Sequence, residues 1–258
     1  LRMTMPTLQL KNIVVAADQQ NAEQTKILKN LNLTINSGDF ISVLGTNGAG
    51  KSTLFNTIAG LLPLTSGEIL LNGQVINHLS PEKRSQQIAR VFQDPKLGTA
   101  PRMTVAENLL LAKRRGQRRT LKPRHLKQQR HEFAQLLATM GNGLDQRLDT
   151  PTENLSGGQR QALSFLMATE KRPELLLLDE HTAALDPKTS TQLMRQTNQV
   201  VTTQQLTCLM ITHHLEDALK YGNRLIILNA GQILLDVSGE QKAALTKQTV
   251  LTYFGQFN

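Results

Sequence analysis

Residues 40–53 read Phe40-Ile41-Ser42-Val43-Leu44-Gly45-Thr46-Asn47-Gly48-Ala49-Gly50-Lys51-Ser52-Thr53, and this stretch determines the fold. Its last nine residues fit the phosphate-binding pattern G-x-x-x-x-G-K-[ST]. In this pattern backbone N–H groups surround the phosphates, while a lysine reaches the outer phosphates and a hydroxyl binds Mg²⁺. The sequence therefore predicts a nucleotide-phosphate site with Lys51 as the cation and Ser52 as a magnesium ligand.

The residues on both sides of this loop support that interpretation. The apolar run 40–44 is typical of a buried strand, and an apolar helix-like pattern follows the loop. Gly45, Gly48 and Gly50 allow positive φ angles and a close approach of the backbone to an anion. A glycine-rich turn that fits the pattern by accident is the alternative. The strand before the loop and the helix after it make the accidental reading the weaker one.

A second apolar run, Leu175-Leu176-Leu177-Leu178, ends on two acids, Asp179 and Glu180. Such a run predicts a buried parallel strand whose carboxyl end opens at a ligand site. Asp179 is placed to hold Mg²⁺ through its water shell, and Glu180 to polarise an attacking water as a general base. In isolation an acidic pair that ends a strand is often only a helix cap. Its combination with the phosphate loop favours the catalytic interpretation.

Strands alternate with helices along the chain, which predicts a doubly wound α/β sheet. Residues 96 to about 168 differ, because helical periodicity and a basic run replace the strand pattern there, so we expect a helical insertion. We expect a single domain over residues 1–258, with a core at about 1–95 and 169–258. The predicted strands are 8–15, 27–35, 40–44, 67–71, 88–92, 175–178, 206–211, 224–228 and 232–235. Predicted helices include 124–140, 188–201 and one short helix in the tail from 243 to 257.

Composition limits the class of protein. One Cys and no Trp among 258 residues fit a reducing compartment and argue against a disulfide framework. No apolar run approaches the length of a membrane span, and the start, Leu1-Arg2-Met3-Thr4-Met5-Pro6, lacks the apolar core of a signal peptide, so we expect a cytosolic chain.

The net charge of +9 favours association with an anionic surface, either nucleic acid or the inner face of the membrane. The basic run from Lys113 to Lys127 is most often a solvated face, with anionic lipid or a membrane partner as the alternative and nucleic acid the least favoured.

Leu155-Ser156-Gly157-Gly158-Gln159 lies between the phosphate loop and the acidic pair. With its motifs in this order the chain resembles the ATP-binding cassette (ABC) ATPases, whose signature is this five-residue sequence. The resemblance implies a P-loop NTPase with a mixed or parallel sheet core, an antiparallel β subdomain and an inserted α-helical subdomain, using ATP and Mg²⁺. A helix that starts at such a turn suits a γ-phosphate. In this family that phosphate belongs to the nucleotide on the opposite subunit, which implies a head-to-tail dimer around two ATP. The implied nucleotide contacts of the signature are Ser156, Gly157, Gly158 and Gln159.

Three further positions match the family one at a time. Gln93 matches the Q-loop glutamine, which contacts Mg²⁺ and the attacking water and begins the segment that touches the membrane partner. Ala184-Leu185-Asp186 matches the D-loop, with Asp186 reaching across the dimer. His213 matches the switch histidine, which contacts the γ-phosphate and holds the general base. The resemblance thus implies Glu180, His213 and Gln93 as catalytic residues and Ser52, Gln93 and Asp179 as metal ligands.

Other positions leave questions open or depart from the family. His214 competes with His213 for the switch position, although the family pattern of an apolar residue, Thr and His favours His213. His181 stands where most relatives have proline, and we interpret it as structural. The family usually stacks adenine on an aromatic near residue 17, whereas this chain reads Val14-Val15-Ala16-Ala17-Asp18. We therefore expect weaker binding of the base, with the phosphate site carrying most of the contact.

Three stretches narrow the resemblance: Asp179 to Pro187, Phe92 to Pro95 and Gly98 to Pro101. They look like the ATP-binding subunit of a bacterial importer group of tryptophan/tyrosine transport systems. This implies ATP hydrolysis that drives import of a small solute such as an aromatic amino acid. The implied partners are integral-membrane permease subunits and an extracytoplasmic substrate-binding protein, and the implied location is the inner face of the cell membrane.

Two other functions compete with this one. A soluble ABC ATPase that acts on nucleic acid or ribosomes would suit the basic charge, but such relatives generally carry two cassettes, a long coiled coil or zinc-binding Cys sets. This chain has one phosphate loop, one signature and one Cys, so no nucleic-acid partner is expected. The third hypothesis is a scaffold protein whose assembly depends on nucleotide. It requires that Glu180 takes no part in hydrolysis.

Overall fold

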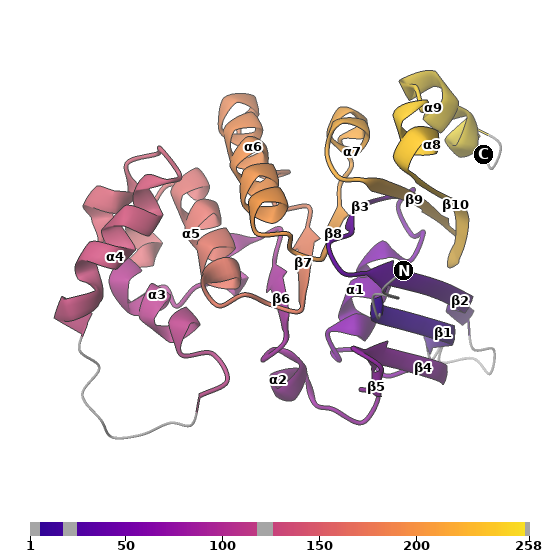
Figure 1. Ribbon diagram of the computed structural model, residues 1–258, viewed down its shortest axis with the longest axis horizontal. Coiled ribbons are helices and arrows are strands. Elements are labelled where there is room, and N and C mark those ends of the chain that lie inside the picture. Colours follow the sequence, from indigo (N-terminus) through magenta and orange to yellow (C-terminus); the bar gives the residue numbers. More distant parts are fainter. Residues whose placement is uncertain (1–5, 18–24, 118–125, 256–258) are drawn as a thin grey trace, which may run out of the picture.

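The computed structural model describes residues 6–17, 25–117 and 126–255, which form two sheets with surrounding helices (Figure 1). The strands are β1 (Pro6–Ala17), β2 (Thr25–Asn36), β3 (Phe40–Leu44), β4 (Ser66–Leu71), β5 (Gln74–Val75), β6 (Ile88–Val91), β7 (Leu175–Asp179), β8 (Cys208–Ile211), β9 (Arg224–Asn229) and β10 (Gln232–Ser238). The α-helices are α1 (Lys51–Ile58), α2 (Pro81–Arg84), α3 (Val105–Lys113), α4 (Leu126–Ala138), α5 (Gly157–Glu170), α6 (Pro187–Thr203), α7 (Leu215–Lys220), α8 (Gly239–Ala243) and α9 (Lys247–Gly255). Short 3-10 helices are η1 (Pro95–Leu97), η2 (Leu144–Arg147) and η3 (Thr152–Asn154).

The larger sheet has the order β10-β9-β3-β8-β7-β6. Its strands from β9 to β6 run parallel, and only β10 pairs antiparallel, with β9. The apolar runs of β3, β7 and β8 are buried almost throughout, as expected for parallel strands covered on both faces. The carboxyl ends of parallel strands lie at one edge of a sheet, so the loops that follow β3, β7 and β8 can meet there.

The smaller sheet is antiparallel and has the order β2-β1-β4-β5. Along β2, buried and exposed residues alternate from Leu31 to Asn36, because one face of this sheet packs on the core and the other meets solvent. The Asn72-Gly73 turn joins β4 to β5 with both residues at positive φ, the conformation that favours Asn-Gly in a two-residue hairpin turn. Leu31 and Ile35 belong to the same buried cluster as Phe55 of α1, so this sheet supports the helix behind the phosphate loop.

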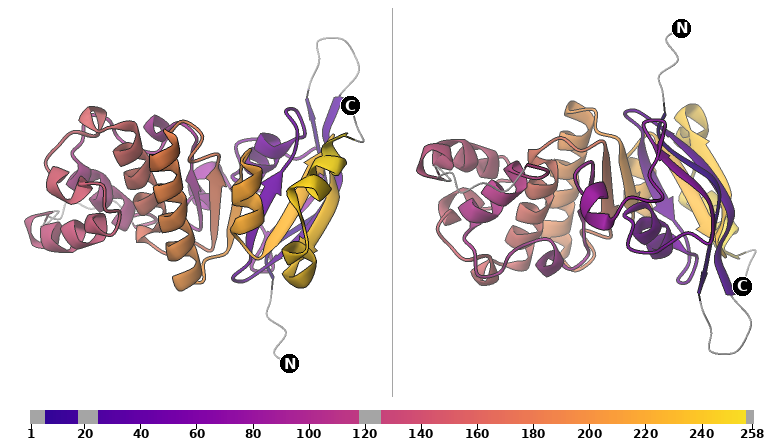
Figure 2. Two further views of the ribbon diagram at one scale, coloured as in Figure 1. Left: turned by 90° about the horizontal axis from the view of Figure 1, so that it is seen from above. Right: turned by 90° about the horizontal axis from the view of Figure 1, so that it is seen from below.

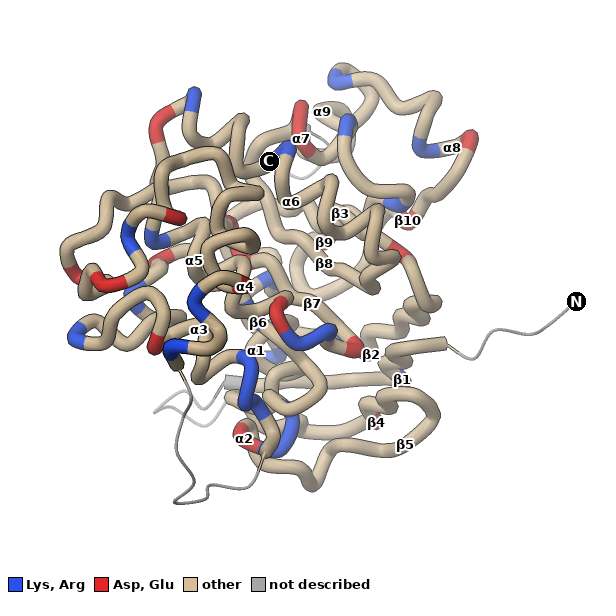
Figure 3. The backbone as a smooth tube through the Cα atoms, turned by 60° about the vertical axis from the view of Figure 1, so that its left-hand side comes forward, with Lys and Arg blue, Asp and Glu red and all other residues tan. Residues whose placement is uncertain are grey.

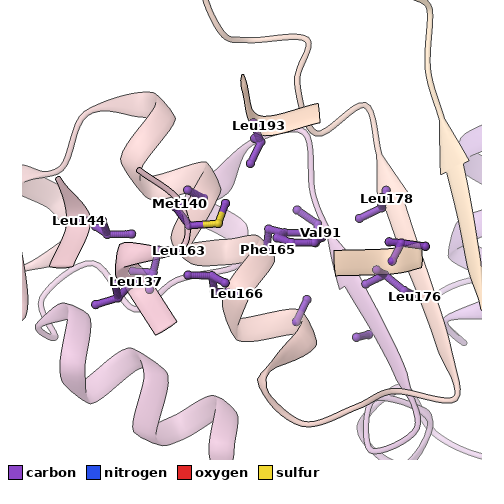
Figure 4. Packing of buried hydrophobic residues seen from close by; sticks show 14 of the residues in the cluster. Val91, Leu137, Met140, Leu144, Leu163, Phe165, Leu166, Leu176, Leu178 and Leu193 are labelled. Carbon is purple, nitrogen blue, oxygen red and sulfur yellow. The ribbon is translucent and has the colours of Figure 1, made fainter. Parts of the chain in front are cut away.

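Helices α3, α4 and α5 lie at the end of the molecule opposite the antiparallel sheet (Figure 2). Their sequences define their starts: Thr104 and Glu107 form a capping box at α3, and Ser156 and Gln159 form one at α5. Figure 4 shows how α5 joins this end to the sheet, because Phe165 reaches toward Val91 of β6 within one buried cluster.

Every predicted strand is present, although β10 continues beyond residue 235 to Ser238. The single tail helix predicted for 243–257 is wrong at its start. The chain instead forms α8 and α9, and the Thr246 hydroxyl between them accepts a hydrogen bond from the Thr249 N–H at 3.1 Å. The start predicted near 124 for α4 lies outside the described residues. Within the described residues, no helix combines the length and the apolar character that a membrane crossing requires.

His181 is a buried histidine, only 2% exposed. Its Nε2 lies 3.0 Å from the Thr197 hydroxyl, and its ring stacks on Phe165 with centroids 6.5 Å apart. Burial lowers the pKa of His181 from 6.5 to about 4. These contacts are those of a neutral core residue, in keeping with the structural interpretation.

This pKa shift makes the stability of the protein depend on pH. The unfolded chain binds the proton first as the pH falls, so the stabilisation is complete above pH 6.5 and is lost between 6.5 and about 4. The loss should be about 3 kcal/mol. We expect His181→Gln, which keeps a partner for Thr197, to remove that much of the pH dependence of the unfolding free energy, measured in urea. His131→Gln on the surface of α4 is the control, and an unchanged pH dependence in His181→Gln would contradict the shift.

Candidate nucleotide-binding and hydrolysis site

The phosphate loop connects the carboxyl end of β3 to α1. Gly48 and Gly50 have positive φ angles of 80° and 101°, as their place in the loop requires. Gly45 has a different role, because a Cβ there would lie 2.4 Å from the carbonyl oxygen of Leu228 in β9. Thr46, Asn47 and Gly48 are exposed, while Ala49 and Gly50 are buried. The loop is therefore held from behind and open in front, and α1 begins with its N–H groups toward the open side.

Lys51 lies inside this loop. Its Nζ donates hydrogen bonds to the carbonyl oxygens of Gly45 at 2.7 Å and Thr46 at 3.0 Å. Burial lowers the pKa of Lys51, and the nearby charges of Glu180 and Asp179 oppose that shift. Lys51 is thus a cation held by loop carbonyls and faced by the acids that end β7.

Asp179 ends β7 and is paired with an arginine. Its Oδ2 lies 2.5 Å from a guanidinium nitrogen of Arg90 in β6. Arg90 also donates to Oδ1 of Asn56 in α1 at 2.6 Å, and its guanidinium lies 4.8 Å from the centre of the Phe92 ring. The sequence analysis missed Arg90. The sequence does show Arg90 as a single cation within an otherwise apolar strand. No local sequence pattern, however, predicts which residue such a cation will pair with.

Glu180 follows Asp179 in an uncommon backbone conformation, with φ of 47°. Its N–H donates to the carbonyl oxygen of Ile211 at 3.0 Å, which fixes it at the end of β8. His213 Nε2 lies 2.5 Å from Glu180 Oε1. The imidazole can therefore orient the carboxylate, as the switch assignment requires. His214 stands at the start of α7, where its N–H donates to the Thr212 hydroxyl.

The signature turn forms the start of α5. The Ser156 hydroxyl accepts from the Gln159 N–H at 3.2 Å, and the Gln159 amide donates to the carbonyl of Asn142 at 3.1 Å. The Ser156 N–H donates in return to Gln159 Oε1 at 3.3 Å. Ser156 and Gly157 are exposed, so the helix starts at the surface with the N–H groups of Gly157 and Gly158 in its first turn. The sequence sets this geometry through the capping box, which needs a hydroxyl at the cap and an amide three residues later.

Asp186 of the D-loop lies next to the signature turn. It caps α6 by accepting from the Thr189 N–H at 3.1 Å, and hydrogen bonding to Thr189 lowers its pKa. A Cβ on Gly158 would come within 2.5 Å of the Thr189 methyl, so the two helix starts touch. Both line one cavity of about 530 Å³. Gln192 of α6 strengthens the contact by donating to the carbonyls of Met140 and Gly141.

The predicted site residues thus form two groups. The first, around the phosphate loop, contains Lys51, Asp179, Glu180 and His213. The second contains the signature turn and Asp186, and Figure 1 shows β6 and β7 between α5 and α1. Gln93 is exposed after β6, where the Gln161 amide of α5 donates to the preceding carbonyl of Phe92 at 2.9 Å.

Some predictions lie partly outside the described residues. The missing adenine stack concerns the side chain of Ala17 and residue 18, which the structure does not describe, and residues 118–125 of the basic run are also outside. In the described part of that run, Lys113 pairs with Glu132 and Arg115 donates to the carbonyls of Ala168 and Lys171. Figure 3 shows Lys and Arg positions beside α2 and α3. Part of this run therefore stabilises the contact between α3 and α5.

Comparisons with known proteins agree with this geometry. A family model described as ABC transporter matches residues 28–183. The chain is 45% identical to the tyrosine transport ATP-binding protein of Clostridioides difficile strain R20291, over 96% of this chain and 98% of the relative. It is 34% identical to the spermidine/putrescine import ATP-binding protein PotA of Haemophilus ducreyi, over 90% of this chain and 60% of PotA. The dimeric post-hydrolysis state of the ATP-binding cassette MJ0796, bound to ADP and Pi, superimposes with a TM-score of 0.76 at 28% identity, over 90% of this chain and 98% of that one.

These matches cover the phosphate loop, the signature and the acidic pair, and the matched cassette holds products of ATP hydrolysis. They confirm the family and the ATPase activity predicted from the sequence. The chain belongs to the ABC transporter family, and it is an ATP-binding, ATP-hydrolysing subunit of that family.

Proposed function

We propose that this chain powers an importer of a small solute, with an aromatic amino acid as the favoured class. The pairing of Glu180 with His213 beside the phosphate loop carries the proposal, because it supplies a held general base where a bound triphosphate would end. A tyrosine transport ATP-binding protein is 45% identical over almost its whole length, which supports the substrate class.

We assign the steps of hydrolysis to the residues described above. The loop N–H groups and Lys51 bind the phosphates of ATP, so Lys51 exchanges its loop carbonyls for phosphate oxygens. Glu180 takes a proton from the attacking water as the oxygen bonds to the γ-phosphorus and the bond to ADP breaks. His213 keeps the Glu180 carboxylate oriented throughout.

The residues present fit a magnesium ion. Ser52, Asp179 and Gln93 offer hydroxyl, carboxylate and amide oxygens, the hard donors that Mg²⁺ prefers. When bound, this ion would neutralise charge on the outer phosphates. We assign Ser52 and Asp179 as its ligands, and Gln93 as the residue that reaches the ion and the attacking water from the segment after β6.

We further propose that two copies, or this chain and a paired cassette, close head to tail around two ATP. The exposed start of α5 supports this, because the first-turn N–H groups of Gly157 and Gly158 offer an anion site, and no phosphate-loop residue is among the residues that line its cavity. Asp186 shares that cavity and would face the same partner. Each phosphate loop then meets the signature turn of the other copy.

A mainly apolar groove of about 450 Å³ between α2, η1 and the helices α3 and α5 suits a helix of a separate permease. Leu61, Leu97 and Leu111 all line it and are 54%, 69% and 48% exposed, so the groove gathers exposed leucines on one face. We propose that residues 96–168 move as a helical subdomain against the remainder, and that closure carries this groove and the permease with it. The chain would then work at the inner face of the membrane, with an extracytoplasmic binding protein delivering the solute.

Lys51→Ala should abolish ATP binding, because it removes the buried cation of the phosphate loop. We expect the affinity for a fluorescent ATP analogue to fall by at least about a hundredfold, since several charged hydrogen bonds are lost. Lys11→Ala, which removes an exposed lysine on β1, should bind as the wild type does. Wild-type affinity in Lys51→Ala would contradict the phosphate assignment.

Glu180→Gln should retain ATP and stop hydrolysis, because the amide keeps the shape of the carboxylate but cannot accept the proton of water. Light scattering with ATP should then show a doubled mass, whereas the ATP-free protein stays monomeric. A monomer that hydrolyses ATP at the wild-type rate would refute both the base and the dimer.

Leu97→Asp should weaken the permease contact without changing the hydrolysis rate of the isolated cassette. The leucine is exposed and lines the groove, so the charge affects only a partner seated there. We expect Leu97→Asp to lose co-purification with the membrane subunits. Leu251→Asp on α9, where a leucine is 45% exposed outside the groove, should retain it. If both variants co-purify equally well with the membrane subunits, the groove is not the docking site.

A further inference from the structure

Arg90 is held on three sides at the edge of the nucleotide site. Asp179 binds one guanidinium nitrogen at 2.5 Å, Asn56 binds another at 2.6 Å, and the Phe92 ring lies beneath at 4.8 Å. The side chain is only 11% exposed. These contacts join β7, α1 and the segment before Gln93, so the guanidinium cannot leave Asp179 without breaking other interactions. The ion pair is therefore a fixed part of the site.

Taken together with Arg90, the first group of site residues has balanced charges. Lys51 and Arg90 are cations, and Asp179 and Glu180 are carboxylates that lie close enough to act on Lys51. Leaving His213 aside, these four side chains carry no net formal charge. Such a site attracts a bare divalent cation only weakly, because each carboxylate is already faced by a cation. ATP changes this, since its phosphates carry several negative charges into the same place.

We propose that Arg90 is a positioning residue that makes metal binding depend on the nucleotide. This inference rests on the proposed role of Asp179 as a magnesium ligand. Arg90 holds Oδ2 of Asp179 and neutralises the carboxylate while no nucleotide is bound, so bare Mg²⁺ is excluded. Arg90 contacts Oδ2 of Asp179 and so keeps the carboxylate in place. The negative charge of bound ATP would offset the guanidinium, so Asp179 would hold the metal only when ATP is present.

Binding of free metal without nucleotide tests this proposal. Mn²⁺ can replace Mg²⁺ and is counted directly by electron paramagnetic resonance. We expect Arg90→Gln to bind Mn²⁺ about tenfold more tightly than the wild type, the order expected when one unit charge beside a divalent ion is removed even with water-like screening. Arg90→Lys, which keeps the charge, should resemble the wild type. Arg90→Gln combined with Asp179→Asn should lose the gain.

The same variants with a non-hydrolysable ATP analogue complete the test. In the wild type the analogue should raise Mn²⁺ affinity strongly, and in Arg90→Gln this increase should shrink by about the same tenfold factor. Thermal melting establishes that each variant is folded. Arg90→Met, which keeps the packing on Phe92, serves for the same measurement if Arg90→Gln is unstable.

Two failures can be told apart. If the Arg90 variants bind free Mn²⁺ no more tightly than the wild type, while Asp179→Asn alone weakens metal binding with the analogue, then this inference is wrong and the metal role of Asp179 stands. If Asp179→Asn alone leaves metal binding with the analogue unchanged, the proposed metal role fails, and the inference fails with it.

Discussion

The parallel pairing of β3, β8 and β7 is the constraint on which the site depends. Val43 of β3 and Asp179 of β7 both pair with Ile211 of β8, so the three strands end side by side. The phosphate loop, the acidic pair and the switch histidine each follow one of these ends. The charges of Asp179 and Glu180 thereby come close enough to act on Lys51, which is far away in the sequence, and His213 comes within 2.5 Å of Glu180. A shift of one residue in either pairing would turn the acids away from Lys51.

The antiparallel sheet has a second purpose, which is to support the phosphate loop from behind. Gly231, at the β9–β10 turn, donates to the carbonyl of Ala49 and accepts from the N–H of Lys29 on β2, both at 3.0 Å. A Cβ on Gly231 would lie 2.0 Å from the carbonyl oxygen of Ile27, so only glycine fits between these backbones. The loop is thus clamped by two sheets, and its anion-binding N–H groups are fixed before any ligand arrives.

Local patterns predicted most of this arrangement. The phosphate loop, the apolar run of β7, the Asn72-Gly73 hairpin and the capped start of α5 are each specified by neighbouring residues, so they could be found without a structure. The partner of Arg90 could not, because a contact between β6 and β7 depends on sheet order, which no short pattern encodes. The division of the tail into α8 and α9 was missed because the apolar periodicity there did not reveal the cap at Thr246, whose hydroxyl accepts from the Thr249 N–H.

The contact between Gly158 and Thr189 joins the starts of α5 and α6 with no room for even one additional carbon atom. Gln192 and Gln196 bind α6 to the carbonyl of Met140 at the end of α4, so three helices share one rigid block. The signature turn and the D-loop are therefore held together, so that they move as one unit. In the proposed head-to-tail dimer, the signature turn and the D-loop would therefore meet the facing subunit in one concerted step.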